Sequence, residues 1–329
     1  MCKVIIGLPI YSYFGLFGLL VMAIIITKTS AAITVSKNNY FEPDEIDYFG
    51  SDETVYPDVD YSAKENSPED GKESLATDDP ETMPQLFQGD IAMDSETYIG
   101  LRLGVNPLKY PKRLWRNGTI PFEISRSYNS EERAAIDNAV HVLNSLTCIN
   151  FVPYDGENDD YLYIQPPDED GPKGCWSYVG RRGGEQIVAL QRPDHSSLHC
   201  FSSEGRIMHE LMHAIGIYHE QSRADRDQYV KIHWENIMPK FKKNFKLVSE
   251  KNGKYSFEYD YNSVMHYGAY YFSKKKGEKP TVTPLMPGKK IGQRRTLSKT
   301  DCLKINELYG CLTGRHAKMY RSFCKLLGL

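Results

Sequence analysis

The 329-residue sequence contains no internal repeat, no low-complexity tract and only one long hydrophobic run, which lies at its amino terminus. Without repeats, the chain is not a solenoid or another repeat protein. Its basic residues are scattered, and no module of interleaved aromatic and basic residues accompanies them, so nucleic acid is not an expected partner. The length suffices to bury a substantial core and by itself permits two or three domains.

The hydrophobic run from Val4 to Ile26 has the features of a secretory signal, since lysines flank it and small residues follow it. We therefore interpret residues 1–32 as a signal peptide removed after Ala32, and we expect a secreted, extracellular protein. The run is long enough to span a bilayer, so a retained type II membrane anchor is the alternative. Sequencing of the secreted product distinguishes the two, because an anchored form keeps residues before Ile33.

The charge of the chain is unevenly distributed. Between Ile33 and Val105 there are 18 Asp and Glu against 4 Lys and Arg, a net charge of −14, so the remaining residues carry +11 of the chain's net −3. A segment this acidic and this poor in apolar residues cannot bury enough surface to fold alone. Its charge favours contact with a basic partner, and the remainder of the same chain is one.

Local patterns indicate two helices besides the one discussed below, and several short strands. Asn129 and Glu132 fit a capping box at the start of one helix, and Ser298 with Asp301 can cap a last helix. Strand-forming residues and one-sided apolar positions mark the other elements. These are strands at Thr119–Ile124, Ile149–Val152, Tyr161–Ile164 and Gln186–Leu190, a helix face of Ile136, Val140 and Leu143, and Leu303, Ile305 and Leu308 in the last helix. The sequence thus predicts an α+β fold.

An eleven-residue segment brings three histidines to one point. His209 and His213 stand four residues apart, so on a helix both imidazoles project from the same face. Gly216 lets the chain leave the helix with a positive φ and return His219 toward the same position. Three protein ligands leave a fourth position for water, which is the arrangement of catalytic rather than structural zinc. The alternative, a helix with solvent-exposed or core histidines, does not require a glycine and a third histidine at these offsets.

The predicted cofactor is one Zn²⁺ ion per catalytic domain. Zinc bound by three histidines lowers the pKa of its water toward neutrality and polarises a substrate carbonyl. Glu210 directly follows the first ligand and is the candidate general base, which accepts the proton of the water and passes it to the departing amine. The alternative role for Glu210 is that of an exposed helix glutamate.

The residues that follow this motif carry a family resemblance. Residues 220–227 read EQSRADRD, and the whole string resembles the pattern HExxHxxGxxHExxRxDRD of the astacin family of metzincin endopeptidases. Residues 263–267, SVMHY, resemble the Met-turn of that family. The match extends from about Trp115 to Cys311. Ile217 departs from the pattern, because the family usually has phenylalanine there, and this change bears on packing more than on chemistry.

The resemblance implies a zincin-like, two-lobed catalytic domain, with a small mixed sheet and helices above the cleft and a largely irregular lower lobe that ends in a C-terminal helix. It implies that Met265 packs as a soft floor beneath the metal. Tyr267 would be an extra zinc ligand at rest that moves to stabilise the oxyanion. His266 is not counted as a ligand. Glu220 would bind the new amino terminus after processing, which would couple maturation to order in the lower lobe.

Residues 87–90, FQGD, resemble the FxGD inhibitory motif of astacin zymogens. The resemblance implies that Asp90 places a carboxylate oxygen on zinc in place of the catalytic water. Taken without the family, Gly-Asp is an ordinary turn pair. The family's spacing puts the activating cleavage upstream of Trp115, near Asn106. The predicted organisation is a signal peptide (1–32), an acidic propeptide (33–105), an astacin-like catalytic domain (106–315) and a short basic tail (316–329).

Six cysteines remain once Cys2 leaves with the signal, and an even number in an exported chain indicates disulfides. Spacing alone allows fifteen pairings. The resemblance implies two bridges, and the two cysteines left over are predicted to pair and to hold the basic tail. The pairs are Cys148 with Cys311, Cys175 with Cys200, and Cys302 with Cys324. Asn117 lies in the chain's one Asn-x-Ser/Thr sequon and is a candidate glycosylation site.

The sequence therefore predicts a secreted, monomeric zinc metalloendopeptidase that is made as an inactive precursor. Its expected partners are protein or peptide substrates, its own propeptide as inhibitor and an activating protease. By resemblance, residues 174–184 lead to an edge strand beside the cleft, where an extended peptide binds through main-chain hydrogen bonds. We expect no further domain after Cys311, so relatives with accessory modules are poor guides to its partners.

Two rival interpretations come from other classes of protein. The first is a catalytically inactive secreted binding protein or effector that retains the fold. Loss of one of the three histidines or of Glu210 would favour it, and the sequence keeps all four. The second is a membrane-tethered sheddase, which depends on the fate of the first segment.

Overall fold

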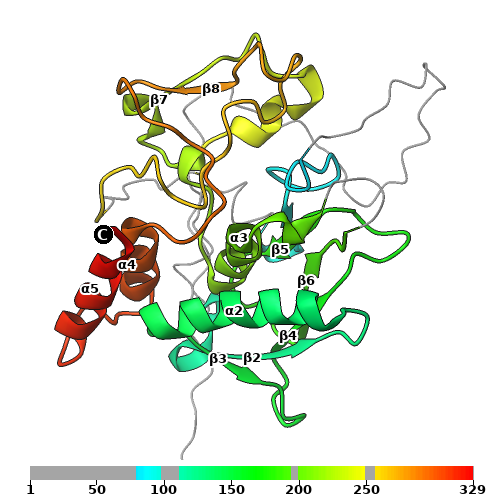
Figure 1. The fold of residues 1–329 in the computed structure, drawn as a ribbon, viewed down its shortest axis with the longest axis vertical. Coiled ribbons are helices and arrows are strands. Elements are labelled where there is room, and N and C mark those ends of the chain that lie inside the picture. Colours follow the sequence, from blue (N-terminus) through cyan, green and yellow to red (C-terminus); the bar gives the residue numbers. More distant parts are fainter. Residues whose placement is uncertain (1–78, 98–110, 194–198, 249–255, 329) are drawn as a thin grey trace, which may run out of the picture. The chain divides into compact units, whose positions relative to one another are not determined.

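The computed structural model of the chain describes residues 79–97, 111–193, 199–248 and 256–328 (Figure 1). The predicted signal peptide, most of the acidic propeptide and the predicted cleavage site near Asn106 lie outside these residues. Within the described ranges, no helix combines the length and the apolar character needed to cross a bilayer. The hydrophobic run on which the membrane-anchor alternative depends is not among them.

A six-stranded mixed sheet forms the framework of the fold, with the strand order β1-β5-β6-β4-β2-β3, and its edge strand β1 comes from the predicted propeptide. β5 runs antiparallel to β6, and every other neighbouring pair is parallel. The strands are β1 (Ile91–Ala92), β2 (Thr119–Ile124), β3 (Asn150–Pro153), β4 (Tyr161–Gln165), β5 (Cys175–Tyr178) and β6 (Glu185–Leu190). The four strands predicted from local pattern are confirmed to within a residue or two, and β1 and β5 are additional.

Two helices pack against this sheet and against each other: α2 (Ser130–Leu146) and α3 (Glu204–Ile215). The predicted capping box of α2 is confirmed, because Asn129 Oδ1 accepts from the Glu132 N–H at 2.9 Å and Glu132 Oε2 accepts from the Asn129 N–H at 2.8 Å. The predicted apolar face of α2 is buried, and it shares one core with the inner residues of the strands and of α3. This core fixes the helix that carries the first two histidines.

The chain between α3 and the last part of the domain has little regular structure, as predicted for the lower lobe. Its described residues form one strand pair, β7 (Val230–Ile232) with β8 (Val282–Pro284), and several short 3-10 turns. A second core of mainly aromatic side chains holds it, including Phe241, Phe245, Tyr267 and Phe272. The α+β, zincin-like fold expected from the sequence is therefore confirmed.

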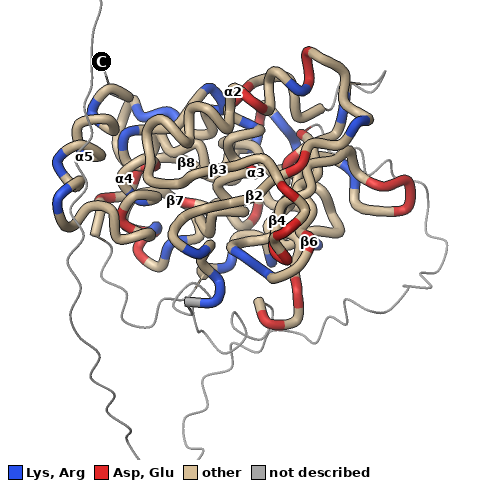
Figure 2. The backbone as a smooth tube through the Cα atoms, turned by 90° about the horizontal axis from the view of Figure 1, so that it is seen from below, with Lys and Arg blue, Asp and Glu red and all other residues tan. Residues whose placement is uncertain are grey.

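The carboxyl-terminal region differs from the prediction. Helix α4 (Lys299–Leu308) begins with the expected Ser298–Asp301 capping box, but it is not the last helix. The predicted basic tail contains a further helix, α5 (Ala317–Lys325), which packs on α4. Cys324 is fully buried there, whereas the lysines and the arginine of α5 are exposed and form a stretch without acidic residues (Figure 2). The sequence predicted only a tail here, because α5 is short and one of its faces becomes buried only when it packs on α4.

Three disulfides join the pairs named from the sequence: Cys148–Cys311, Cys175–Cys200 and Cys302–Cys324. The first closes a loop of 163 residues and ties the end of the α2 region to the carboxyl-terminal part. The third closes 22 residues and fixes α5 to α4.

Replacement of both Cys302 and Cys324 by alanine should lower the free energy of unfolding by up to about 3 kcal/mol, because the cross-link restricts the unfolded chain over a short loop. The measurement is urea denaturation of the purified precursor. Removal of Cys148 and Cys311 should cost more, since the loop it opens is longer. Equal midpoints for the parent and the Cys302→Ala/Cys324→Ala variant would show that this cross-link adds nothing to the stability of the domain.

Candidate metal centre and active site

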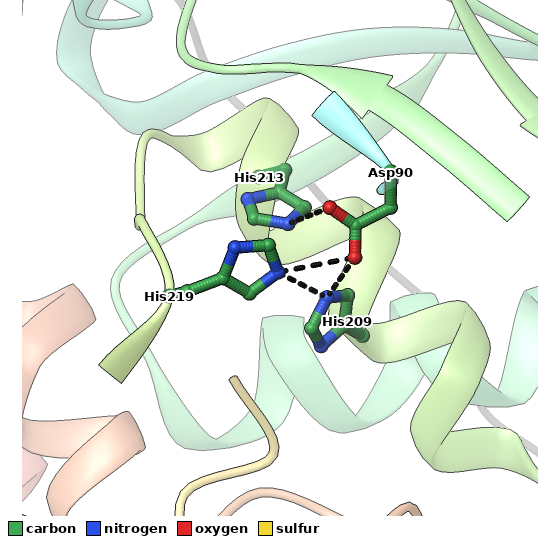
Figure 3. Close-up of side chains that lie close together, drawn as sticks. All are labelled: Asp90, His209, His213 and His219. Atoms are coloured by element: carbon green, nitrogen blue, oxygen red, sulfur yellow. Dashed lines mark hydrogen bonds and ion pairs between the residues drawn. The ribbon is translucent and has the colours of Figure 1, made fainter. Parts of the chain in front are cut away.

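Three imidazoles and one carboxylate converge in the interior of the domain (Figure 3). His209 and His213 project from α3, and Gly216 ends this helix with a φ of 125°, as its position predicted. The chain then returns His219 toward the same point. The Nε2 atoms of His209 and His219 lie 3.1 and 3.0 Å from Asp90 Oδ2, and His213 Nε2 lies 3.6 Å from Asp90 Oδ1. One ligand atom from each of the four residues falls within 4.8 Å of the others.

Each imidazole is oriented by a contact at its other nitrogen. His209 Nδ1 lies 2.8 Å from the Val264 carbonyl oxygen, and His213 Nδ1 lies 2.7 Å from that of Ile217. His219 Nδ1 lies 2.8 Å from Gln88 Oε1, on the segment that precedes Asp90. Because an acceptor faces every Nδ1, the proton belongs on that atom and each Nε2 is left free to bind a metal.

Burial keeps these groups in the form that metal binding needs. All four side chains are essentially inaccessible to solvent. Burial lowers the pKa of His213 and lowers that of His219 to about 3, so both imidazoles are neutral donors. Burial also disfavours the charge of Asp90, but the three imidazoles that face its oxygens outweigh this effect, and the pKa of Asp90 lies well below its usual value.

Glu210 is fully buried beside this cluster, and neither of its oxygens has a hydrogen-bond partner among the described residues. Burial first, and then the charge of Asp90, raise the pKa of Glu210 well above its usual value. His213 Nε2 and Asp90 Oδ1 also lack a hydrogen-bond partner within the described part of the chain. Buried polar atoms are normally satisfied, so this set fits a cation held by the imidazoles with Glu210 beside it. Nitrogen and carboxylate donors of this kind suit zinc.

The turn at residues 263–267 lies against the histidines and joins the two cores. Met265 is buried in the core that contains α3, whereas Tyr267 belongs to the aromatic core. The Tyr267 hydroxyl donates to the Gln88 carbonyl at 2.5 Å, and its ring centroid lies 4.9 Å from that of His219. The sequence named Tyr267 as an extra metal ligand, but in this state its hydroxyl is bound to the segment around Asp90. Among the described residues, the metal-facing set contains Asp90 and the three histidines but not His266.

Asp301 supports this turn, although the sequence indicated only its capping role. Its Oδ1 accepts from the Ser263 hydroxyl at 2.6 Å and its Oδ2 accepts from the Val264 N–H at 2.8 Å. The Val264 carbonyl in turn orients His209. One carboxylate thus links the start of α4 to a metal-facing histidine.

Glu220 follows the third histidine and is also buried. Its Oε1 accepts from Arg223 Nη1 at 3.0 Å and from the Asp260 N–H at 2.9 Å, and its Oε2 pairs with Lys304. Lys304 and Arg223 therefore already balance this carboxylate, which the sequence assigned to the new amino terminus. Asn117, the candidate glycosylation site, is exposed.

The segment around Asp90 crosses the site as a tight turn. The N–H groups of Phe87 and Ile91 each donate to the other's carbonyl at 3.0 Å, and Gly89 between them has a φ of 89°. A Cβ at Gly89 would lie 2.5 Å from the Glu81 carbonyl oxygen, so only glycine fits. Strand β1 then pairs with β5, with Ile91 opposite Ser177. Gln88, the variable position of the motif quoted above, contacts both His219 and Tyr267.

Comparisons with known proteins agree with this geometry. The model of the Astacin peptidase family matches residues 107–310. Zinc metalloproteinase nas-4 of Caenorhabditis elegans is 39% identical over 243 residues, which cover 71% of this chain and 71% of that protein. Zinc metalloproteinase nas-13 of the same organism is 37% identical over 290 residues, which cover 84% of this chain and 60% of that protein.

A solved structure is similar as well. High choriolytic enzyme 1, a hatching enzyme zinc-protease from Oryzias latipes, superposes with a TM-score of 0.52 at 38% sequence identity, and the alignment covers 60% of this chain and 94% of that chain. A helix-borne pair of histidines with an adjacent glutamate, a third histidine after a glycine turn, and a methionine turn behind them define a zinc metallopeptidase. Within that class, the chain belongs to the astacin family of peptidases.

Proposed function

We propose that this chain is a secreted endopeptidase that hydrolyses peptide bonds of proteins and is made as a zymogen. The observation that carries the proposal is the convergence of three Nε2 atoms and the Asp90 carboxylate beside a buried Glu210 whose oxygens have no hydrogen-bond partner in the described ranges. Substrates of the protein or peptide class follow from membership of a peptidase family. The chain spans only 60% of nas-13, so the finer choice of substrate is not carried over from that relative.

In this proposal His209, His213 and His219 hold one zinc ion, which when bound activates a water and polarises the substrate carbonyl. Glu210 is the general base, since its buried carboxylate is next to the metal-facing histidines and its oxygens have no hydrogen-bond partner among the described residues, which leaves them to accept a proton and to return it to the departing amine. Tyr267 releases Gln88 once the propeptide leaves and then donates to the oxyanion. Met265 packs beneath the histidines.

Latency in this proposal comes from the propeptide, residues 33–105. Asp90 holds the position that the catalytic water needs, because its oxygens face all three imidazoles. Strand β1 also takes the edge of β5, where the Ser177 N–H donates to the Asp90 carbonyl at 3.0 Å. An extended substrate would use the same edge once the propeptide is removed. Cleavage near Asn106 by another protease would start this change.

Secretion is supported by the signal-like residues 1–32 and by the three disulfides, which are typical of exported proteins.

After processing, Glu220 would bind the ammonium group of the new amino terminus, and Lys304 or Arg223 would then have to share the carboxylate. A monomer and a glycan on the exposed Asn117 complete the proposal. The inactive binding protein has no specific observation in its favour.

Digestion of gelatin or casein by the trypsin-activated protein tests the proposed activity. We expect hydrolysis that 1,10-phenanthroline abolishes and added zinc restores, together with about one zinc per molecule by elemental analysis, because three imidazoles form a complete catalytic ligand set. A folded protein that contains zinc and digests neither substrate would favour the binding protein. Absence of stoichiometric metal from the activated protein would contradict the whole proposal.

A further inference from the structure

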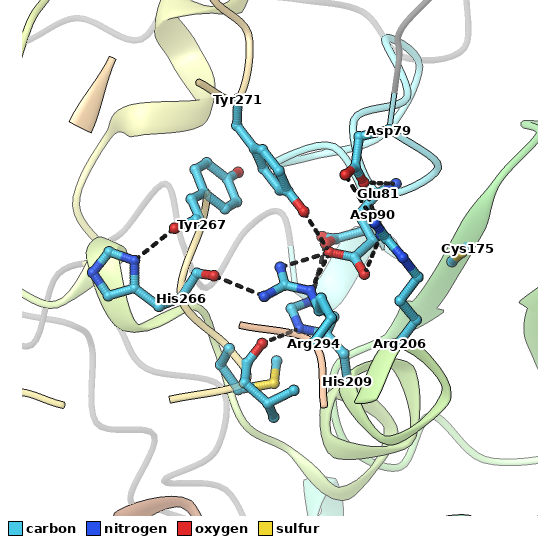
Figure 4. Close-up of polar contacts among 12 residues, drawn as sticks. Asp79, Glu81, Asp90, Cys175, Arg206, His209, His266, Tyr267, Tyr271 and Arg294 are labelled. Carbon is cyan, nitrogen blue, oxygen red and sulfur yellow. Dashed lines mark hydrogen bonds and ion pairs between the residues drawn. The ribbon is translucent and has the colours of Figure 1, made fainter. Parts of the chain in front are cut away.

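A cluster of charged residues lies beside the metal centre and is separate from the metal-facing set (Figure 4). Glu81, in the predicted propeptide, is fully buried between two arginines of the catalytic domain. Arg206 Nη1 donates to Glu81 Oε1 at 2.8 Å, and Arg294 Nε donates to Oε2 at 2.6 Å. The Tyr271 hydroxyl donates to the same Oε2 at 3.0 Å. The catalytic domain thus binds both oxygens of this carboxylate.

A second carboxylate completes the balance of charge. Asp79 forms a bidentate pair with Arg206, with distances of 2.9 Å to Nη1 and 3.0 Å to Nη2. Burial by itself would raise the pKa of Glu81, but the charges of Arg294 and Arg206 outweigh it, and the pKa lies well below its usual value. Glu81 is therefore ionised at physiological pH. Two carboxylates face two guanidinium groups, so each buried charge of this cluster has a charge of opposite sign beside it.

The two arginines are held in place by the catalytic domain itself. Arg206 lies one turn before His209 on α3, and its Nε donates to Ser202 Oγ at 3.1 Å. Arg294 Nη1 donates to the His266 carbonyl at 2.9 Å. The backbone of Arg294 packs directly on α3, because a Cβ at Gly205 would lie 2.2 Å from the Arg294 carbonyl oxygen. The guanidinium groups are thus fixed by neighbours on the catalytic side.

The propeptide backbone fits closely at the same place. The Cys175 N–H donates to the Pro80 carbonyl at 2.8 Å, and a Cβ at Gly174 would lie 2.2 Å from that oxygen. The turn through Gly89 closes over the Glu81 carbonyl from the other side. The position of Glu81 along the site is therefore set by backbone contacts as well as by charge.

We propose that Arg206, Arg294 and Tyr271 form a carboxylate-binding site of the catalytic domain, whose ligand in the precursor is Glu81 together with Asp79. This site anchors the propeptide independently of the Asp90 contact at the metal centre. The inference rests on the proposed zymogen function, to which it adds a second point of attachment. Loss of the Glu81 charge leaves the guanidinium of Arg294 buried without a carboxylate, which favours release of the segment into water.

Hydrogen exchange of the full-length precursor, read by mass spectrometry of peptides from residues 83–91, tests this site without relying on catalysis. The background variant Glu210→Gln prevents self-processing during the measurement. In it, Glu81→Gln should accelerate exchange of these amides at least about tenfold, because the segment opens more often. Glu96→Gln is the matched control, since the Glu96 side chain, which pairs with Lys112 and Arg113, is 56% exposed, and its replacement should change exchange by less than about twofold.

A variant on the other side of the contact guards against an indirect effect. Arg206→Gln should accelerate exchange of the same amides. The acceleration in the double variant Glu81→Gln/Arg206→Gln should be less than the product of the two single accelerations, because each single change removes the same interaction. A Glu81→Gln variant that keeps Glu210 serves as the check on folding. Trypsin processing near Asn106 removes residue 81, so after activation this variant should have the same kcat/KM as the activated wild type.

The outcomes separate this site from the proposed function. Exchange unchanged in both Glu81→Gln and Arg206→Gln would overturn the carboxylate-binding site and leave the Asp90 contact and the backbone contacts to hold the segment. A precursor that is active before processing, yet exchanges faster when Glu81 is changed, would overturn the zymogen proposal while the site stands.

Discussion

Replacement of Glu210 by glutamine is expected to remove most of the peptidase activity of the trypsin-activated enzyme while zinc stays bound. Glutamine keeps the volume of the side chain, but its amide cannot accept and return a proton. The loss of kcat should be on the order of 10²–10⁴-fold, the usual contribution of a general base. Steady-state hydrolysis of a peptide substrate measures it, and elemental analysis of the same preparation measures the zinc.

The matched control is Glu204→Gln, which makes the same chemical change on the same helix. Glu204 is exposed in the first turn of α3 and lies away from the metal-facing residues. Its replacement should leave kcat within about twofold of the parent, since an exposed helix glutamate contributes little beyond a favourable interaction with the helix dipole. Hydrolysis near the parent rate by a zinc-loaded Glu210→Gln enzyme would refute the assignment of the base.

Replacement of Asp90 by alanine should make the full-length precursor active before any processing. The Asp90 carboxylate faces all three imidazoles, and alanine offers no oxygen in its place. If that contact is worth about 1.4 kcal/mol or more, the fraction of precursor with an open site rises at least about tenfold. The rate of casein hydrolysis by the precursor, relative to the same sample after trypsin, measures its latency.

Glu96→Ala serves as the control, because it removes an exposed carboxylate from the same segment. The carboxylate-binding site predicts that Asp90→Ala remains partly latent and that addition of Glu81→Gln raises its activity further. Unchanged latency of Asp90→Ala would count against the blocking role, even if the geometry around the histidines is correct.

The metal-facing histidines were predictable because their arrangement is a local property of the chain. A spacing of four residues on a helix puts His209 and His213 on one face, and Gly216 allows the turn that returns His219. The two capping boxes were predictable for the same reason, since each involves residues three apart. Two of the disulfide pairs, in contrast, came from the family resemblance, because spacing alone allowed many pairings, and the third was predicted from the two cysteines left over.

The contacts that the sequence missed join residues far apart in the chain. Glu81 is 125 residues from Arg206 and 213 from Arg294, and no periodicity links such positions. Asp301 was identified as a cap, but its support of the methionine turn depends on where α4 packs. Helix α5 was taken for a tail because its buried face exists only against α4.

By itself, the sequence predicted the metal-facing histidines and a candidate general base, because these depend on residue types at short, fixed offsets, whereas the proposed blocking role of the Asp90 segment came from the family resemblance. Only the tertiary structure decided how that segment is held. It is held by buried ion pairs, by a shared sheet edge and by glycines that leave room for a neighbouring backbone, and all of these arise only when distant residues pack together. The free energy of such contacts depends on burial, which a linear pattern does not contain.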